Sequence, residues 1–252
     1  MSTSSLNRRS FLQSSALLGA ATLPGLAAEP VSTRKLKIVC VGGHPDDPES
    51  GCAGTLALYA AQGHATTVIY LTRGERGIPN KSLDEAAAIR SAECVNACKL
   101  IGAKPVFFGQ IDGATEFTRA HVDTMTRLLT AETPDLVLTH WPVDSHMDHQ
   151  VASMLAIRAC MALKPRPPVY FFEVNTGSQA QGFFPNTYVD VTPVLEKKKE
   201  ALVVHLSQDG LGTWKQHHEV IANWRGREAG VGAAEAFVQL NHHSQHGRLP
   251  GV

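Results

Sequence analysis

The sequence predicts an α/β fold in which a mostly parallel β-sheet lies between two layers of helices. Short apolar and β-branched stretches alternate with longer stretches of helical spacing from residue 35 onward. This alternation is typical of parallel strands joined by right-handed helical crossovers, which bury both faces of the sheet. No internal repeat or long linker divides this part of the sequence. We therefore expect one Rossmann-like three-layer αβα sandwich.

The elements of the first half are marked by their composition and by the residues that end them. Residues 35–42 are apolar and β-branched, as in a buried strand, and small apolar residues at helical spacing follow in 51–62. Gly63 and Gly102 suit the left-handed position that ends a helix. The same criteria predict strands at 66–72 and 105–108, helices at 84–101 and 118–131, and loops at 73–82 and 109–117.

The second half continues the alternation. Pro134 precedes a predicted strand at 135–139, and Thr192 is a favourable N-cap for the helix that follows it. The remaining predicted elements are strands at 169–174 and 187–191, helices at 149–163, 193–206 and 213–230, and a long loop at 175–185.

Composition limits the classes of function. The chain has 252 residues, of which 43% are hydrophobic, and its formal net charge is zero. This supplies enough apolar surface for one sizeable core, and the sequence has no basic stripe that would indicate a nucleic-acid partner. The five cysteines lie in apolar predicted elements and form no Cys-x-x-Cys pair. We interpret them as small buried hydrophobic residues, not as a disulfide framework or a zinc site.

Residues 1–28 are expected to be an export signal and not part of the fold. Arg8 and Arg9 precede Phe11 and a weakly apolar run that ends at Ala28, a pattern that resembles a twin-arginine signal peptide. A Sec signal and an uncleaved anchor are the alternatives, but the run is too short and too rich in Ala, Gly and Ser for a stable membrane span. Residues 29–252 would then form the mature domain, in the periplasm or another extracytoplasmic space.

A histidine and two adjacent carboxylates follow the first predicted strand. His44, Asp46 and Asp47 lie on a turn that a Gly-Gly pair and Pro45 make sharp and stiff. The Gly-x-Gly-x-x-Gly pattern of dinucleotide-binding proteins is absent from this turn. His44 and one aspartate can bind a divalent metal, with the other aspartate beside it as a general base. An ordinary surface turn is the alternative, because Asp, Pro and Gly favour turns.

A second cluster follows the strand at 135–139 and contains His146, Asp148 and His149. The carboxyl ends of parallel strands meet at one edge of a sheet, so both clusters should face the same crevice. Two histidines and one aspartate on a metal, with a position left open for water, form a catalytic arrangement. A helix cap and a core histidine are the alternative interpretation of this second cluster.

Further motifs accompany the two clusters. They are His-Pro-Asp-Asp at 44–47, small residues at 51–55, Arg-x-x-Glu at 90–93, His-x-Asp-His at 146–149, a Lys-x-x-Ala…Ser-Gln helix at 198–208 and the segment 227–237. Together they resemble the LmbE-like, or PIG-L, deacetylases, which are zinc enzymes that remove acetyl groups from N-acetylglucosamine-type sugars. Pro48 departs from the pattern, because the family often has Glu directly after His-Pro-Asp-Asp.

The resemblance implies a role for each residue of the first cluster. His44, Asp47 and His149 would be the metal ligands, on one Zn²⁺ per chain or another divalent metal. Asp46 would be the general base that takes a proton from the attacking water. One of the adjacent aspartates would then stay ionised on the metal, and the other would remain basic enough to accept a proton.

The resemblance also implies catalytic and substrate-binding residues. His146 would face the acyl carbonyl, where a protonated imidazole stabilises the oxyanion, and Asp148 would hold that imidazole. Arg90 and Asp112 match positions that hold the sugar. From the residues alone, Arg90 could equally be a surface helix residue paired with Glu93, and Asp112 could be part of an Asp-Gly turn.

The function that follows is a metal-dependent N-deacetylase that acts on an N-acetylated amino sugar. Three alternatives stay open: an amidase for a sugar-linked amide other than acetyl, a metal-dependent phosphoesterase, and a non-catalytic sugar-binding protein. A phosphoesterase would usually need a second metal and more ligands. A binding protein would be expected to lose Asp46, which is present. Family members range from monomers to higher assemblies, so a homo-oligomer is among the expected states.

Overall fold

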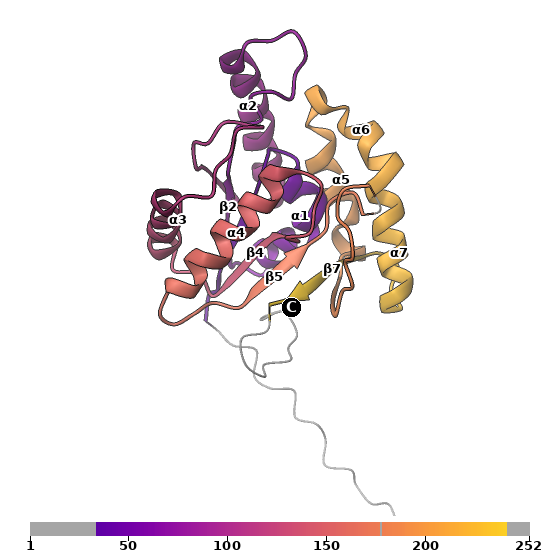
Figure 1. Ribbon diagram of the computed structural model, residues 1–252. Coiled ribbons are helices and arrows are strands. Elements are labelled where there is room, and N and C mark those ends of the chain that lie inside the picture. The colour runs from indigo at the N-terminus through magenta and orange to yellow at the C-terminus, as the bar shows by residue number, and fades with distance from the viewer. Residues whose placement is uncertain (1–33, 177, 241–252) are drawn as a thin grey trace, which may run out of the picture. The chain divides into compact units, whose positions relative to one another are not determined.

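Seven strands form one sheet in the computed structural model, which describes residues 34–176 and 178–240 (Figure 1). They are β1 (Lys37–Gly42), β2 (Ala65–Tyr70), β3 (Lys104–Phe107), β4 (Leu136–His140), β5 (Val169–Phe172), β6 (Thr187–Asp190) and β7 (Ala234–Gln239). Their order in the sheet is β3-β2-β1-β4-β5-β7-β6. The pairs from β3 to β5 are parallel, and β7 is antiparallel to both β5 and β6. The mostly parallel sheet is as predicted.

Helices cover both faces of this sheet and complete the three layers (Figure 1). One face carries α1 (Asp47–Ala61), α2 (Leu83–Ile101) and α5 (Leu195–Val203), and the other carries α3 (Arg119–Glu132) and α4 (Met147–Ala162). Alternate residues of β1 point to opposite faces, as the pleat of a strand requires. Ile38 and Cys40 belong to the core under α1, whereas Val39 and Val41 belong to the core under α4. The predicted αβα sandwich is confirmed.

Small residues bring α1 close to the sheet. A Cβ at Gly51 would overlap the ring of Phe172 on β5, and a Cβ at Gly54 would stand 2.6 Å from Val191. The cysteines share this role of small packing residues, since all five are buried and free, as expected. Close packing fixes the N-terminus of α1 against the carboxyl ends of the central strands.

The largest differences from the sequence-based expectation concern three elements. Strand β7 was not predicted, because its buried Glu235 interrupts the apolar pattern; that carboxylate pairs with the buried Lys198 at 2.6 Å. Helix α1 begins at Asp47 and not at Gly51, since Pro48 suits the first helical turn and Glu49 Oε2 accepts a hydrogen bond from Asp46 N. In place of the expected helix 213–230, α6 (Gly210–Thr213) ends at Thr213 and is followed by a π-helical segment (Trp214–His218) and α7 (Glu219–Ala229).

The chain changes direction in the sheet between β1 and β4. From β1 it moves outward through β2 to β3, and then returns to place β4 on the other side of β1. In open α/β sheets, ligands bind in the crevice at the carboxyl ends of the two strands where the order reverses. The two predicted clusters directly follow these strands, which places them at that crevice.

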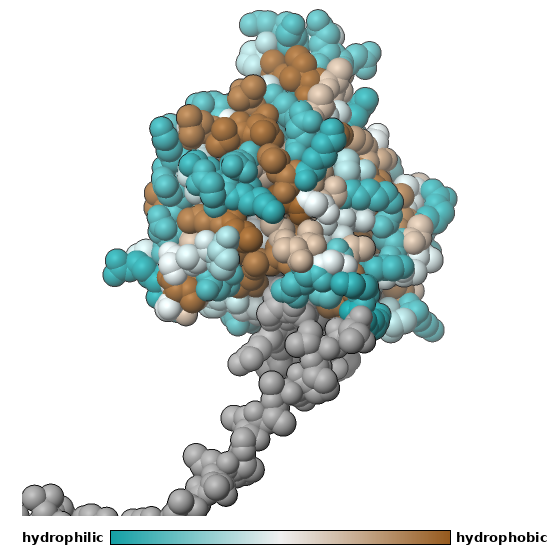
Figure 2. All heavy atoms as spheres, turned by 180° about the vertical axis from the view of Figure 1, so that it is seen from behind, coloured by the Kyte–Doolittle hydropathy of each residue, from teal (hydrophilic) through white to brown (hydrophobic). Residues whose placement is uncertain are grey.

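Hydrophobic residues also reach the outer surface in places. Figure 2 shows brown, hydrophobic patches separated by teal, hydrophilic side chains on the face opposite to the view of Figure 1. Within residues 34–176 and 178–240, no helix is long and apolar enough to cross a bilayer. The export signal predicted at 1–28 lies outside the described residues, so it stays a prediction.

Candidate metal centre and active site

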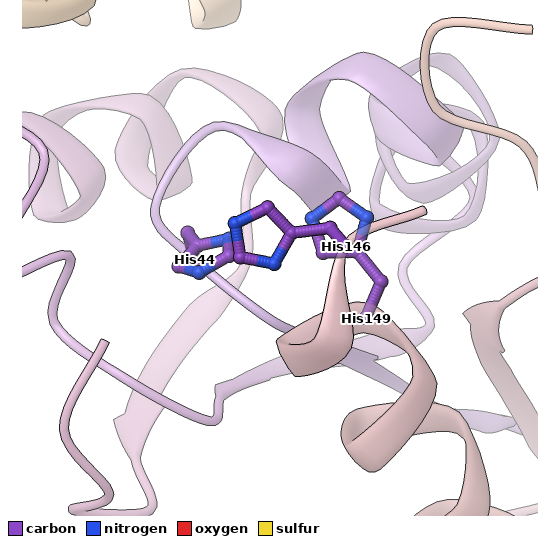
Figure 3. A group of neighbouring side chains, drawn as sticks. All are labelled: His44, His146 and His149. Carbon is purple, nitrogen blue, oxygen red and sulfur yellow. The ribbon is translucent and has the colours of Figure 1, made fainter. Parts of the chain in front are cut away.

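Three imidazoles meet at the crevice between β1 and β4. His44 lies on the turn after β1, and His146 and His149 lie at the start of α4; Figure 3 shows their rings grouped together. The ring centroids are 4.6 Å apart for His44 and His146 and 4.7 Å apart for His146 and His149. Gly43 permits this approach, because a Cβ there would stand only 3.0 Å from Asp47 Oδ2 and from His149 Cδ2. The two predicted clusters therefore form one site.

Asp47 lies between the imidazoles. Its Oδ2 is 3.0 Å from His44 Nδ1, 3.2 Å from His149 Nε2 and 3.5 Å from His140 Nε2. Burial alone would raise the pKa of Asp47, but His149 and His44 outweigh burial and hold that pKa well below its usual value. Asp47 is thus an ionised, buried carboxylate between two histidines, which is what a metal ligand must be.

Carboxylates also hold the outer nitrogens of these imidazoles. His44 Nε2 lies 2.9 Å from Asp148 Oδ2 and 3.3 Å from Asp112 Oδ1. His149 Nδ1 lies 3.1 Å from Asp144 Oδ2. Carboxylates in such positions fix the tautomer and the orientation of metal-binding imidazoles. With Nδ1 of His149 facing Asp144, its Nε2 can offer a lone pair to an ion.

The charge balance of the centre fits a divalent cation. Burial would lower the pKa of His149, but Asp47 and Asp144 outweigh it and raise that pKa to about 9. The pKa of His44 is raised in the same way, with Asp47 as the main source. Both imidazoles take up protons to balance buried carboxylates, and a bound cation would take over that role. Three groups of side chains within the described ranges have ligand atoms within 4.8 Å of one another: His44 with His146 and His149, His44 with Asp112, His146 and Asp148, and Asp47 with His140 and His149.

Asp46 stands beside this centre at the N-terminus of α1. Its backbone is in a left-handed conformation, with φ of 103°, which is strained for a residue with a Cβ. Arg90 Nη2 donates hydrogen bonds to Asp46 Oδ2 at 3.0 Å and to the Pro45 carbonyl oxygen at 2.6 Å. Burial raises the pKa of Asp46, Arg90 offsets only part of the rise, and the charge on Asp47 adds to it. Of the two adjacent aspartates, Asp46 is therefore the better proton acceptor.

Arg90 and Asp112, each of which had a structural alternative in the sequence, both lie at the cavity. Arg90 is 3% exposed and lines the cavity described below, while Glu93 instead accepts hydrogen bonds from Ser207. The alternative of a surface Arg90–Glu93 pair is wrong. Asp112 does lie in a turn, but its carboxylate is buried, accepts a hydrogen bond from Arg76 N and also lines the cavity.

Asp148 makes different contacts from those the resemblance implied. Its carboxylate accepts hydrogen bonds from Gly113 N at 2.7 Å and Thr115 Oγ1 at 2.6 Å, and it faces His44. Asp148 makes its hydrogen bond to His146 through the backbone N–H, which donates to Nδ1 at 3.3 Å, while a carboxylate oxygen lies within 4.8 Å of a ring nitrogen of His146. The reason is that Asp148 points from the first turn of α4 toward the 109–117 loop. Asp148 therefore orients His44 in this structure.

His146 also differs in its expected charge. Burial lowers the pKa of His146, and the charges of His44 and His149 lower it further. Since Nδ1 accepts the Asp148 N–H, the ring proton belongs on Nε2. His146 is thus a neutral hydrogen-bond donor at this edge of the cavity, and not the imidazolium that the resemblance implied.

A polar cavity of about 330 Å³ opens over the centre. The first half of the chain supplies its charged lining, and the second half supplies mostly uncharged polar groups. The lining residues are His44, Asp46, Asp47, Ser50, Arg76, Gly77, Arg90, Asp112, His146, His149, Val174, Asn175, Gln179, Gln208, Thr213 and His218. Every predicted site residue except Asp148, which lies buried behind His44, reaches the cavity.

Sequence reasoning missed three residues of the site. His140 ends β4, stacks on His149 with centroids 4.1 Å apart and accepts a hydrogen bond from Gly43 N. Asp144 lies two residues before the His-x-Asp-His motif at 146–149, and this position was the one available signal for its role. His218 lies in a predicted helix far along the chain, where no sequence pattern linked it to the site.

Comparisons with known proteins place the chain in a family. Residues 39–160, which contain both clusters, match the family model PIG-L: GlcNAc-PI de-N-acetylase. The chain is also 31% identical to a 4-oxalmesaconate hydratase of Pseudomonas putida, over 82% of this chain and 88% of the relative. The chain belongs to the PIG-L family.

Other PIG-L relatives are deacetylases of acetylated amino sugars by name. A diacetylchitobiose deacetylase of Thermococcus kodakarensis is 29% identical, over 80% of this chain and 82% of its own length. The structure of an N,N′-diacetylchitobiose deacetylase from Pyrococcus horikoshii superposes with a TM-score of 0.72 at 27% identity, covering 81% of this chain and 83% of that one. The PIG-L match ends at residue 160, before the part of the chain that supplies the uncharged cavity lining.

Proposed function

We propose that this protein is a metal-dependent deacetylase of N-acetylated amino sugars. The observation that carries the proposal is that Asp47 Oδ2 lies 3.0 Å from His44 Nδ1 and 3.2 Å from His149 Nε2, and that these residues and Asp46 line one polar cavity. Two imidazoles and one carboxylate suit zinc and leave a position for water. Deacetylases among the relatives support the choice of an amide over other substrates.

A divalent metal would be held by His44, Asp47 and His149, and zinc is the ion that this nitrogen and oxygen donor set suits. When bound, such an ion polarises an amide carbonyl and lowers the pKa of water toward ~7. Asp144 faces Nδ1 of His149, and Asp148 faces Nε2 of His44. These contacts would keep the two imidazoles in their binding orientation.

Asp46 acts as the general base in this proposal. It accepts the proton of the attacking water and then returns it to the leaving amine, which departs as a neutral group. The pKa of Asp46, raised by burial, suits this work. Arg90 holds the carboxylate by the hydrogen bond to Oδ2, so Arg90 positions the base as well as lining the cavity.

His146 stabilises the oxygen that gains charge when water adds to the carbonyl carbon. Its Nε2–H is free to donate, because Nδ1 is occupied by the Asp148 N–H. Asp112 and the outer edge of Arg90 would bind sugar hydroxyls, since both reach the cavity. A neutral donor gives weaker stabilisation than an imidazolium but does not need to be protonated at neutral pH.

The test is a screen for released acetate. Purified protein is incubated with N-acetylglucosamine, N,N′-diacetylchitobiose and other N-acetylated sugars, after chelation and again after zinc is restored. We expect acetate from at least one sugar only when metal is present. Acetate release that persists after chelation, or no release from any sugar with metal restored, contradicts the proposal.

A second candidate is a hydratase of an unsaturated acid. The relative at 31% identity carries that activity in its name, and a hydratase also needs activated water. Incubation of the metal-loaded protein with conjugated unsaturated dicarboxylic acids, followed by ultraviolet absorbance, separates the two. Loss of absorbance without acetate release from any sugar would favour the hydratase.

We also propose export through the twin-arginine route, on the sequence of residues 1–28 alone. A receptor reads the arginine pair itself, not only its charge. The double variant Arg8→Lys, Arg9→Lys should accumulate as a precursor in the cytoplasm. A normal yield outside the cytoplasm would argue for a Sec signal.

A further inference from the structure

The cavity has an uncharged lining that the proposed mechanism does not use. Asn175 follows β5, Thr213 ends α6, and His218 ends the π-helical segment. All three line the cavity that contains the metal centre. In the described part of the chain, the cavity residues after His149 include no lysine, arginine, aspartate or glutamate.

His218 has an unsatisfied polar atom. The residue is 3% exposed, and among the described residues its Nε2 has no hydrogen-bond partner. Buried polar groups are nearly always paired, so a buried nitrogen without a partner at a cavity wall points to a ligand. The π-helical turn that carries His218 supports this, because such turns are rare and frequently occur at functional sites.

Asn175, on the loop after β5, also has a buried polar atom without a hydrogen-bond partner among the described residues. Its Nδ2 donates a hydrogen bond to Gln179 Oε1 at 2.9 Å, which fixes the amide. Its buried Oδ1 has no partner in residues 34–176 and 178–240. The backbone of Asn175 is left-handed, with φ of 44°. Two residues from segments far apart in the sequence, each with a buried polar atom that has no partner among the described residues, thus line the same cavity.

The chemistry of this lining is neutral. Burial, with the charge of nearby Lys198, lowers the pKa of His218 to about 3, so its imidazole is uncharged at neutral pH. Lys198 is itself paired with Glu235 and with the Ser50 carbonyl oxygen. A neutral imidazole and an amide exchange hydrogen bonds well with hydroxyl and amide groups, whereas an ionised carboxylate or phosphate would be better served by cations.

We propose that His218 and Asn175 are substrate-contacting residues that bind uncharged hydroxyl or amide groups of the sugar. The inference rests on the proposed deacetylase function and defines its substrate class: a neutral, hydroxylated amino sugar or oligosaccharide, not one that bears an acidic group at this position. His218 contributes binding and does not take part in the proton transfers.

The test measures binding and turnover separately. In zinc-loaded Asp46→Asn protein, which does not consume the ligand, titration calorimetry with N,N′-diacetylchitobiose gives the Kd directly. Adding His218→Leu should raise this Kd about 3- to 10-fold, the loss usual for one hydrogen bond between uncharged groups. In the protein with Asp46 intact, His218→Leu should raise KM by a similar factor and change kcat by less than about threefold.

Two variants separate contact from a structural role. His217→Leu alters the neighbouring histidine, which does not belong to the cavity lining, and should leave Kd unchanged. His218→Gln retains a hydrogen-bonding group near Nε2 and should recover most of the lost affinity. If His218→Leu, with full zinc content, binds the disaccharide as tightly as its parent, the proposal is overturned. If His218→Leu and His218→Gln weaken binding of the disaccharide equally, the proposal is also overturned, because restoring a hydrogen-bonding group would then have no effect on the Kd.

Substrate analogues give a readout that does not depend on the folding of His218→Leu. Monodeoxy N-acetylglucosamines each lack one hydroxyl, and wild-type protein should bind at least one of them more weakly than the parent sugar. His218→Gln, which keeps a hydrogen-bonding group near Nε2, should retain most of that discrimination. Wild-type protein that releases acetate but binds all deoxy analogues like the parent would contradict this inference alone, whereas absence of any acetate release would contradict the proposed function.

Discussion

At the scale of single residues, two adjacent aspartates acquire different properties from their surroundings. Asp47 lies between His44 and His149, which lower its pKa, while burial raises the pKa of Asp46. The resemblance supplied this division of labour, but only the packing explains it. The sequence could not place Asp144 or predict that the Asp148 carboxylate faces His44, because both depend on how α4 meets the loops beside it.

The variant Asp46→Asn tests the role of the base. The amide keeps the shape and a hydrogen-bonding oxygen for Arg90 but cannot accept a proton. The rate of acetate release should fall by roughly 10²–10⁴, while zinc binding stays intact. Stopped assays and elemental analysis of the same sample measure both quantities. If zinc is lost together with activity, Asp46 is a ligand.

His149 and His146 should separate metal binding from catalysis. His149→Ala removes a nitrogen that faces Asp47, so zinc affinity should fall and excess zinc should partly restore activity. His146→Ala should keep zinc affinity and lower kcat by about 10²–10³, the scale of one lost oxyanion donor. Since the pKa of His146 is lowered, no loss of rate from its deprotonation is expected between neutral and alkaline pH. Zinc titrations and pH–rate profiles of both variants measure these effects. If His146→Ala loses zinc and His149→Ala keeps it, the two roles are reversed.

At the scale of elements, the sequence predicted what local pattern determines. Strands β1 to β6 and the helices between them follow apolar runs and helix-ending glycines such as Gly102, whose φ is 74°. Strand β7 was not predicted, because one residue of a buried charge pair interrupts its apolar pattern. The π-helical turn at Trp214–His218 was not predicted, because it interrupts a helical pattern and contains no Gly or Pro that would mark the interruption.

Close packing of α1 on the sheet can be tested at Gly51. Gly51→Ala would press a methyl group into the ring of Phe172 and should destabilise the fold by ~1–3 kcal/mol, despite better helix propensity. Urea unfolding measures the change. Combining it with Phe172→Leu makes room for the methyl group, so the double variant should be less destabilised than the sum of the two single changes. Simple additivity would mean that the two residues do not press on each other.

At the scale of the whole molecule, the crevice between β1 and β4 assembles groups from across the sequence. His44 and Asp47 follow β1, Asp112 follows β3, and His149 opens α4. The meeting of the two clusters was predictable because both follow parallel strands, whose carboxyl ends lie at one edge of a sheet. The uncharged lining, with Asn175 and His218, was not predictable, because it depends on how the last helices pack beyond β5.

The raised pKa values of His149 and His44 predict that metal binding releases protons. In the metal-free protein the pKa of His149 is raised to about 9 and that of His44 is also raised, so both are protonated at pH 7. Zinc must displace these protons, and binding at pH 7 should release about two of them. Affinity should therefore fall as pH falls. Calorimetry in buffers of different ionisation enthalpy counts the protons; release of none would mean that these imidazoles do not bind the metal.

The central claim is that one metal, held by His44, Asp47 and His149, makes this protein a deacetylase. The most direct measurement is a titration of metal-stripped protein with zinc, in which bound metal and acetate release from N,N′-diacetylchitobiose, or the best sugar of the screen, are recorded together. We expect acetate release to rise in proportion to bound zinc and to level off at about one zinc per chain. Acetate release that does not depend on bound zinc, or tight zinc binding without any acetate release, would contradict the account.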